Sequence, residues 1–363
     1  MSVLTLDHSA DPFLEKIGVG LDNLGEGDST RLPTLYECAA HLKLLNAIVR
    51  LQVDVEEWAD ITGKEKEEAW SMYCSAAVER FLKWSQAAGV ADEDETVPPL
   101  DILMVWHSYM LNTAAYQRYM KVSPKGRLGR GIDWGAVYQR IGEDDRFNMS
   151  IKDKSSMDKL GLQPDLLSLL TNGGLRSGDA GPTSPCEPLK FDMVAAVLRQ
   201  LRFAHKMHRN EWLHSRFSNK ILESAIKRYA MFFTLIGENP GNRMAPTPDI
   251  DLVWHTHQLS PNRYGVYSAA KANGRFIHHN DSVAKERIHD SFIAAKTLFQ
   301  KRFGRKYSIC YCDHCMVSCT LRSSNSPVAH TLHDSLECAV TTCYGGQCRA
   351  CEDCGDCEEC DLS

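Results

Sequence analysis

The sequence lacks any long apolar run. No stretch of its 363 residues approaches the roughly 18 consecutive apolar residues expected of a transmembrane helix. Residues 1–18 also lack the apolar segment of a secretory signal, because charged side chains interrupt them. We therefore expect no membrane association and a cytoplasmic or nuclear location, where thiols stay reduced.

Familiar catalytic signatures are missing as well. There is no Gly-rich phosphate loop, no GxSxG elbow and no HExxH motif. We also find no convincing set of nucleophile, base and orienting group. The sequence therefore names no catalytic residue and leaves open whether the protein is an enzyme.

Net charge is concentrated at the C-terminal end. The formal net charge is -6, and residues 345–363 account for -5 of it with six acids and one base. The rest of the chain is near neutral, which argues against a nucleic-acid surface driven by bulk charge. We expect a protein partner rather than a nucleic acid.

Cysteine is rare in the first 309 residues, which hold Cys38, Cys74 and Cys186. The other eleven cysteines lie between Cys310 and Cys360. In a reducing compartment, such clustering favours metal ligation or redox chemistry over structural disulfides.

The composition is otherwise that of a soluble globular protein. Hydrophobic residues make up 43% and charged residues 24%, which permits a sizeable core. Apolar residues recur at helical spacing in residues 35–53, 69–81 and 193–203. The sequence predicts an all-α protein.

The chain contains an internal repeat. Residues 77–81 match residues 225–229, and residues 101–107 match residues 249–255, both at an offset of 148 residues. Further on, a Gly-Arg-x-Ile segment recurs with the spacing shortened by three: Gly129 to Ile132 echoes Gly274 to Ile277. A constant offset predicts two tandem copies of one helical unit.

Four parts follow from this organisation. They are a first helical unit at 1–145 with its core at about 35–145, a linker at 146–187, a second unit at 188–305, and a Cys-rich tail at 306–363. Residues 171–184 are rich in Gly, Ser and Thr and lack periodicity, so we expect a flexible linker. The tail is expected to be largely irregular and to fold, if at all, around metal.

Each copy centres on an Asp-(x)4-Trp-His segment. Asp101 and Asp249 follow prolines and precede apolar runs, so we expect them to be helix N-caps. Residues 102–106 are apolar all round, which predicts a buried helix. The expected core of the repeat comprises Asp101, Trp106, His107, Asp249 and Trp254.

The second copy offers a candidate metal site. Asp251 and His255 are four residues apart and share one face of a helix. His257 can join them only if the helix ends just after it, and the three then form a ligand set typical of non-haem iron. The first copy has Leu103 in place of Asp251 and Tyr109 in place of His257, so a buried structural Trp-His pair is the competing interpretation.

The cysteines form two further candidate sites. The first cluster offers the thiolate and imidazole ligands that zinc binds in a tetrahedron. Its spacing is tighter than that of paired Cys-x-x-Cys knuckles. It comprises Cys310, Cys312, His314, Cys315 and Cys319. The alternative is a set of free thiols packed against the last helix.

The terminal cysteines recur every three residues with acids between them. They are Cys348, Cys351, Cys354, Cys357 and Cys360. Overlapping Cys-x-x-Cys units can chelate soft metals or form reversible disulfides. A disordered acidic tail with incidental thiols is the competing interpretation.

The stretch at residues 249–261, DIDLVWHTHQLSP, resembles the glycine-rich domain-containing protein-like family of plants and fungi, and residues 101–116 resemble the family's other copy of the motif. The resemblance covers about residues 35–320 and is of fungal type in its Cys310-Tyr311-Cys312 segment. It implies a domain largely of unknown function, linked in plants to development and stress responses. Some fungal relatives carry a dioxygenase label, whereas the Gly-rich tail of many relatives is replaced here by acidic spacers.

Two functions compete. The favoured one is a non-enzymatic interaction or regulatory protein, with a duplicated helical scaffold and a tail that binds zinc or responds to redox state. The alternative is a metal-dependent enzyme, such as a non-haem iron oxygenase, with its site in the second repeat.

Overall fold

The computed structural model describes residues 31–86, 96–122, 127–173, 191–280, 285–312 and 315–317. Within these ranges the regular structure is helical, and the only β-type pairing is an isolated bridge between Ile141 and Phe147. The predicted all-α class is confirmed. Over the same ranges, none of the helices has the length and apolar character needed to span a membrane.

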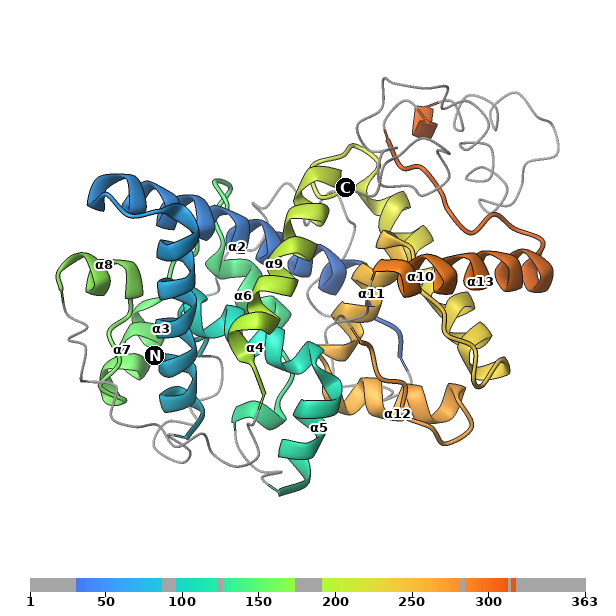
Figure 1. The fold of residues 1–363 in the computed structure, drawn as a ribbon, viewed down its shortest axis with the longest axis horizontal. Helices are drawn as coiled ribbons and strands as arrows, with labels where there is room; N and C mark the ends of the chain where they lie inside the picture. Colours follow the sequence, from blue (N-terminus) through green and yellow to red (C-terminus); the bar gives the residue numbers. More distant parts are fainter. Residues whose placement is uncertain are drawn as a thin grey trace, which may run out of the picture.

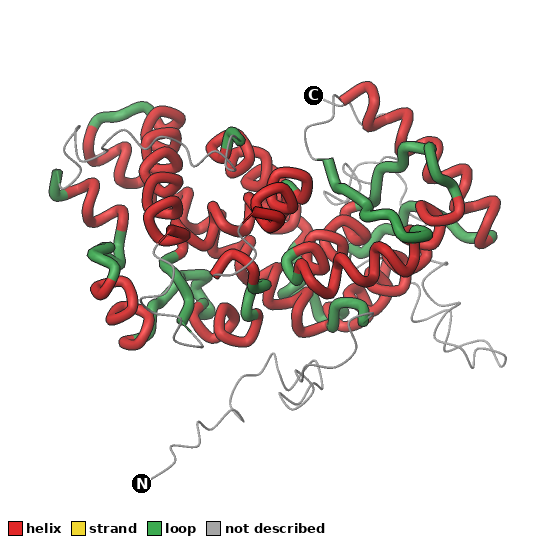
Figure 2. Tube along the Cα trace, turned by 90° about the horizontal axis from the view of Figure 1, so that it is seen from below, coloured by secondary structure: helices red, strands yellow, loops and turns green. Residues whose placement is uncertain are grey.

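Helices of the first half are α2 (Leu35–Thr62), α3 (Lys66–Gln86), α4 (Leu100–Leu111), α5 (Thr113–Val122), the 3-10 turn η3 (Arg127–Gly129), α6 (Trp134–Arg140), α7 (Ile151–Lys159) and α8 (Leu166–Thr171). Those of the second half are α9 (Met193–Asn210), α10 (Ser218–Glu238), α11 (Pro248–Gln258), α12 (Pro261–Lys271) and α13 (Lys285–Phe303). Figure 2 shows these helices joined by loops in two neighbouring groups.

Helix α2 begins at a well-formed cap. The Thr34 hydroxyl accepts a hydrogen bond from the Glu37 backbone N–H, and the Glu37 carboxylate accepts one from the Thr34 backbone N–H, at 3.2 and 2.7 Å. The helix ends at Gly63, whose φ of 67° is a left-handed conformation that glycine adopts without strain. These signals fix both ends of the longest helix in the described part of the chain.

The protein has two hydrophobic cores, and α2 lies between them. One side of α2 places Ala40 and Leu44 in the first core, and another places Leu42 and Leu45 in the second. Figure 1 shows α2 extending from the group around α3, α4 and α6 towards the group around α10, α11 and α13. Its N-terminal half is buried on all sides because it is covered from both directions.

Helix α9 also belongs to both cores. It packs on α2 and contributes Met193 and Val197 to the first core, and Ala204 and Met207 to the second. Helices α2 and α9 therefore pack against each other, and the two cores share this central helix pair.

Part of the segment expected to be a linker is helical. Helix α7 is capped by Ser150, helix α8 is capped by Asp165, and Met157 and Leu166 lie in the first core. The first core thus extends to at least Leu166, beyond the predicted boundary at residue 145. Residues 174–190 lie outside the described residues.

Candidate metal sites

The repeated aspartates anchor both copies in the same way. The Arg80 Nε donates to Asp101 Oδ2 at 2.6 Å, and the Arg228 Nε donates to Asp249 Oδ2 at 2.6 Å. Arginine and aspartate are both buried in each copy. Both pairs are related by the offset of 148 residues found in the sequence.

The predicted N-cap role of Asp101 and Asp249 is wrong. The N-caps are Pro99 for α4 and Thr247 for α11, and the aspartates lie within the first helical turn. A buried carboxylate requires a charged partner, and the arginine of the preceding long helix supplies it. Burial raises the pKa of Asp101, although Arg80 opposes this.

Two of the three residues of the predicted histidine-carboxylate site come together. His255 Nε2 lies 3.4 Å from Asp251 Oδ1, one turn apart on α11. The third member of the group is His279, from the loop after α12: its Nε2 lies 3.0 Å from Asp251 Oδ1 and 3.4 Å from His255 Nε2. The structure therefore assembles Asp251, His255 and His279 within reach of one ion.

His257 lies elsewhere. It is inside α11, two residues beyond His255, so it projects from another face of the helix. Its Nδ1 lies 2.9 Å from the Tyr229 hydroxyl, and its ring is fully buried. Burial, and then the charge of Arg263, lower the pKa of His257 well below 6.5. This histidine packs in the second core and takes no part in the group.

The histidine of the first copy has a different partner. His107 Nε2 lies 3.0 Å from His41 Nε2, and His41 Nδ1 lies 2.9 Å from the Thr256 hydroxyl on α11. Burial, with the nearby His255, lowers the pKa of His107 to about 3. His41 thus joins the two Trp-His helices through neutral, buried imidazoles.

The first cysteine cluster is partly assembled. The sulfur atoms of Cys310, Cys312 and Cys315 lie within 4.8 Å of one another, and these residues carry thiols rather than disulfides. Cys310 and Cys315 are buried and Cys312 is partly exposed. The proposed ligands His314 and Cys319, and the terminal cysteines from Cys348 to Cys360, lie outside the described residues.

This cysteine segment is anchored on the second core. The Tyr311 hydroxyl, between two of the cysteines, hydrogen-bonds to Ser224 Oγ at 2.9 Å and to Asp249 Oδ2 at 3.0 Å. The Tyr307 carbonyl accepts a hydrogen bond from Arg228. The segment expected to start an irregular tail is therefore fixed to the buried Arg228–Asp249 pair.

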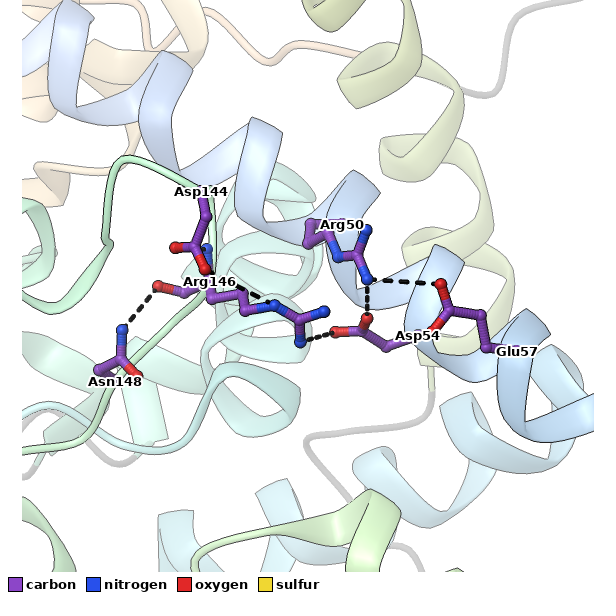
Figure 3. A network of polar contacts seen from close by, with 6 residues as sticks. All are labelled: Arg50, Asp54, Glu57, Asp144, Arg146 and Asn148. Carbon is purple, nitrogen blue, oxygen red and sulfur yellow. Dashed lines mark hydrogen bonds and ion pairs between the residues drawn. The ribbon is translucent and has the colours of Figure 1, made fainter.

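A cleft of about 790 Å³ lies on the first core, lined by α2, the loop at residues 145–149 and α8. Asp54 accepts from Arg50 at 2.5 Å and from Arg146 at 3.1 Å (Figure 3). Arg146 is further held by Asp144 at 3.6 Å. These arginines and aspartates are therefore paired with one another at the rim of the cleft.

Comparison with known proteins gives one family. Residues 169–266 match the sequence profile described as "Glycine-rich domain-containing protein-like", a stretch that includes Asp251 and His255. Glycine-rich domain-containing protein 1 of Arabidopsis thaliana is 26% identical over 274 residues, which cover 70% of this chain and 30% of the relative. Glycine-rich domain-containing protein 2 of the same plant is 28% identical over 219 residues, covering 58% and 26%. This chain thus spans less than a third of either relative, and no solved structure matches it.

Proposed function

We propose that this chain, which is similar to the glycine-rich domain-containing protein-like family over residues 169–266, is a non-catalytic interaction protein whose segment 310–315 binds a zinc ion. The observation that carries this proposal is the gathering of three thiols, from Cys310, Cys312 and Cys315, within 4.8 Å. Thiolates are the ligands zinc prefers in structural sites, where it takes four in a tetrahedron. In the sequence, His314 and Cys319 are the candidates for the fourth ligand.

Metal binding at this segment would act on the helical body. Tyr311 joins the segment to Asp249 in the first turn of α11, and Asp249 pairs with Arg228 of α10. An ion that orders residues 310–315 would therefore hold the start of the Trp-His helix. We propose that the metal or redox state of these cysteines adjusts a surface that binds a protein partner.

Zinc content of the purified full-length chain tests the site. Serine at positions 310, 312 and 315 together is expected to remove one zinc ion per chain. A chain ending at Thr320 keeps this site and lacks the seven cysteines that follow, so it is expected to retain that ion. Truncation before Tyr307 would be a poor test, because Tyr307 and Tyr311 are part of the second core.

Cys74→Ala is the matched control, because burial in the first core raises the pKa of this thiol to about 12 and keeps it protonated. Its zinc content should equal that of the unmodified chain. Equal zinc in the triple serine variant and the unmodified chain would reject the proposed site.

A further inference from the structure

We propose that Asp251, His255 and His279 bind a divalent first-row transition metal ion, at a second site that is independent of the cysteines. Two imidazole nitrogens and one carboxylate oxygen converge from helix α11 and the loop that follows α12. This donor set suits iron(II), zinc, cobalt or manganese better than the softer ions that thiolates select.

The distances fit simultaneous coordination. Ligand atoms that lie about 2.1 Å from one ion are about 3.0 Å apart at a right angle and about 3.4 Å apart at the tetrahedral angle. The observed separations are 3.0 Å between Asp251 and His279, 3.4 Å between His255 and His279, and 3.4 Å between His255 and Asp251. An ion can be placed among the three atoms with little movement of the side chains.

The surroundings hold the imidazole rings while leaving the carboxylate accessible. His255 packs against Phe203, with ring centroids 4.4 Å apart, and His279 meets Trp254 edge to face at 4.8 Å. The exposed fraction of the side chain rises from 2% for His255 through 10% for His279 to 21% for Asp251. An ion would thus be fixed from the protein side and could hold water or a further ligand on the open side.

The charge of the site is suited to a cation. Asp251 supplies the one acidic ligand of the three, and its Oδ1 lies 3.0 Å from His279 Nε2 and 3.4 Å from His255 Nε2. The amine of Lys206, on α9, also acts on Asp251, so Lys206→Gln is expected to strengthen metal binding by removing a competing positive charge.

The first copy of the repeat has only one of the three ligands. At the offset of 148 residues, Leu103 stands in place of Asp251 while His107 matches His255. At the offset of 145 that aligns the Gly-Arg segments, Trp134 stands in place of His279. Copy one instead places His107 against His41. The site is thus specific to the second copy, where α11 supplies the carboxylate and the loop after α12 supplies the second imidazole.

Cobalt(II) titration of the full-length chain tests this site. Cobalt held by thiolates gives a sulfur-to-metal charge-transfer band in the near ultraviolet, and cobalt held by nitrogen and oxygen does not. We expect Asp251→Asn and His279→Gln each to lower the cobalt stoichiometry by one, with the charge-transfer band unchanged. The neighbouring His278→Gln, whose side chain lies by Thr113, is the control and should bind as the unmodified chain does.

The triple variant Cys310→Ser, Cys312→Ser, Cys315→Ser (the serine variant) separates the proposed cysteine site from the proposed histidine-carboxylate site. It should lose charge-transfer intensity and keep the ion held by nitrogen and oxygen. Loss of the charge-transfer band in the serine variant shows that the cysteine site exists. Loss of one cobalt ion in Asp251→Asn or His279→Gln shows that the second site exists. Circular dichroism of each variant shows whether its helices are retained.

Footprinting of the unmodified chain makes the test independent of any substitution. Diethyl pyrocarbonate modifies imidazole nitrogens, and mass spectrometry locates the products. Cobalt is expected to protect His279 while His278 and the exposed His289 react as before. Unchanged stoichiometry in both folded variants, or equal modification of His279 with and without cobalt, would overturn the proposed site.

Discussion

The guanidinium of Arg228 lies 2.6 Å from the carboxylate of Asp249, and the Tyr311 hydroxyl lies 3.0 Å from the same carboxylate oxygen. This oxygen connects three segments distant in sequence: helix α10, the start of α11 and the cysteine-bearing stretch. The first copy repeats the ion pair with Arg80 and Asp101, where Arg80 also donates to the Gln163 carbonyl at 2.7 Å. In both copies the buried pair therefore attaches a later segment of chain to the Trp-His helix.

Loss of either buried carboxylate should destabilise the protein strongly. Asp101→Ala and Asp249→Ala each leave a buried arginine without its partner, which costs about 3–5 kcal/mol. Urea denaturation followed by circular dichroism measures the free energy of unfolding. Asp54→Ala, in the ion-pair network at the rim of the cleft, is the control and should cost about 1 kcal/mol or less. A loss below 1 kcal/mol in both repeat variants would contradict this role.

Acid should destabilise the protein through its buried histidines. Burial lowers the pKa of His107 to about 3, and burial with the charges of His107 and His255 lowers that of His41 well below 6.5. The unfolded chain takes up these protons at about pH 6.5, whereas the folded chain does not. Stability is therefore fully present above pH 6.5 and decreases towards pH 3, by up to about 1.4 kcal/mol per pH unit for each histidine.

Urea denaturation at several pH values, with a chelator present, measures this slope. His107→Gln should show a shallower decrease below pH 6.5 than the unmodified chain. The exposed His289→Gln on α13 should retain the original slope. Identical slopes in all three proteins would show that folding does not lower the pKa of His107.

Removal of the Tyr311 hydroxyl should loosen the cysteine segment. Tyr311→Phe loses the hydrogen bonds to Ser224 and Asp249, at a cost of about 1–3 kcal/mol, because both buried groups lose a hydrogen-bond partner. We expect faster alkylation of Cys310 and Cys315, measured by mass spectrometry against time. Tyr119→Phe on α5 is the control and should leave the alkylation rates unchanged, and equal rates in both variants would argue against anchoring by Tyr311.

Local sequence signals predicted much of the helical structure. The apolar spacing of residues 35–53 located α2, which continues to Thr62. The 148-residue offset marked Asp101 and Asp249 as equivalent, but their ion pairs with Arg80 and Arg228 were not predicted. Helices α7 and α8 were not predicted, because they are short and directly precede the Gly- and Ser-rich stretch at residues 171–184. Their capping residues Ser150 and Asp165 were available signals.

The residues of the histidine-carboxylate site were also predicted only in part. Asp251 and His255 were predicted to lie together because four residues complete one turn of a helix. His279 was missed because a loop 24 residues further along the chain brings it back to α11, and nothing local marks that return. The sequence signal for His279 is its place in the repeat, two residues after Ile277, where the first copy has Trp134.

X-ray absorption at the zinc edge of the purified full-length chain identifies the atoms that hold the ion. We expect sulfur scatterers at about 2.3 Å from zinc, and their number should fall in the triple variant Cys310→Ser, Cys312→Ser, Cys315→Ser. Zinc bound only by nitrogen and oxygen, or a sulfur shell unchanged by the three substitutions, would contradict a thiolate site in this segment.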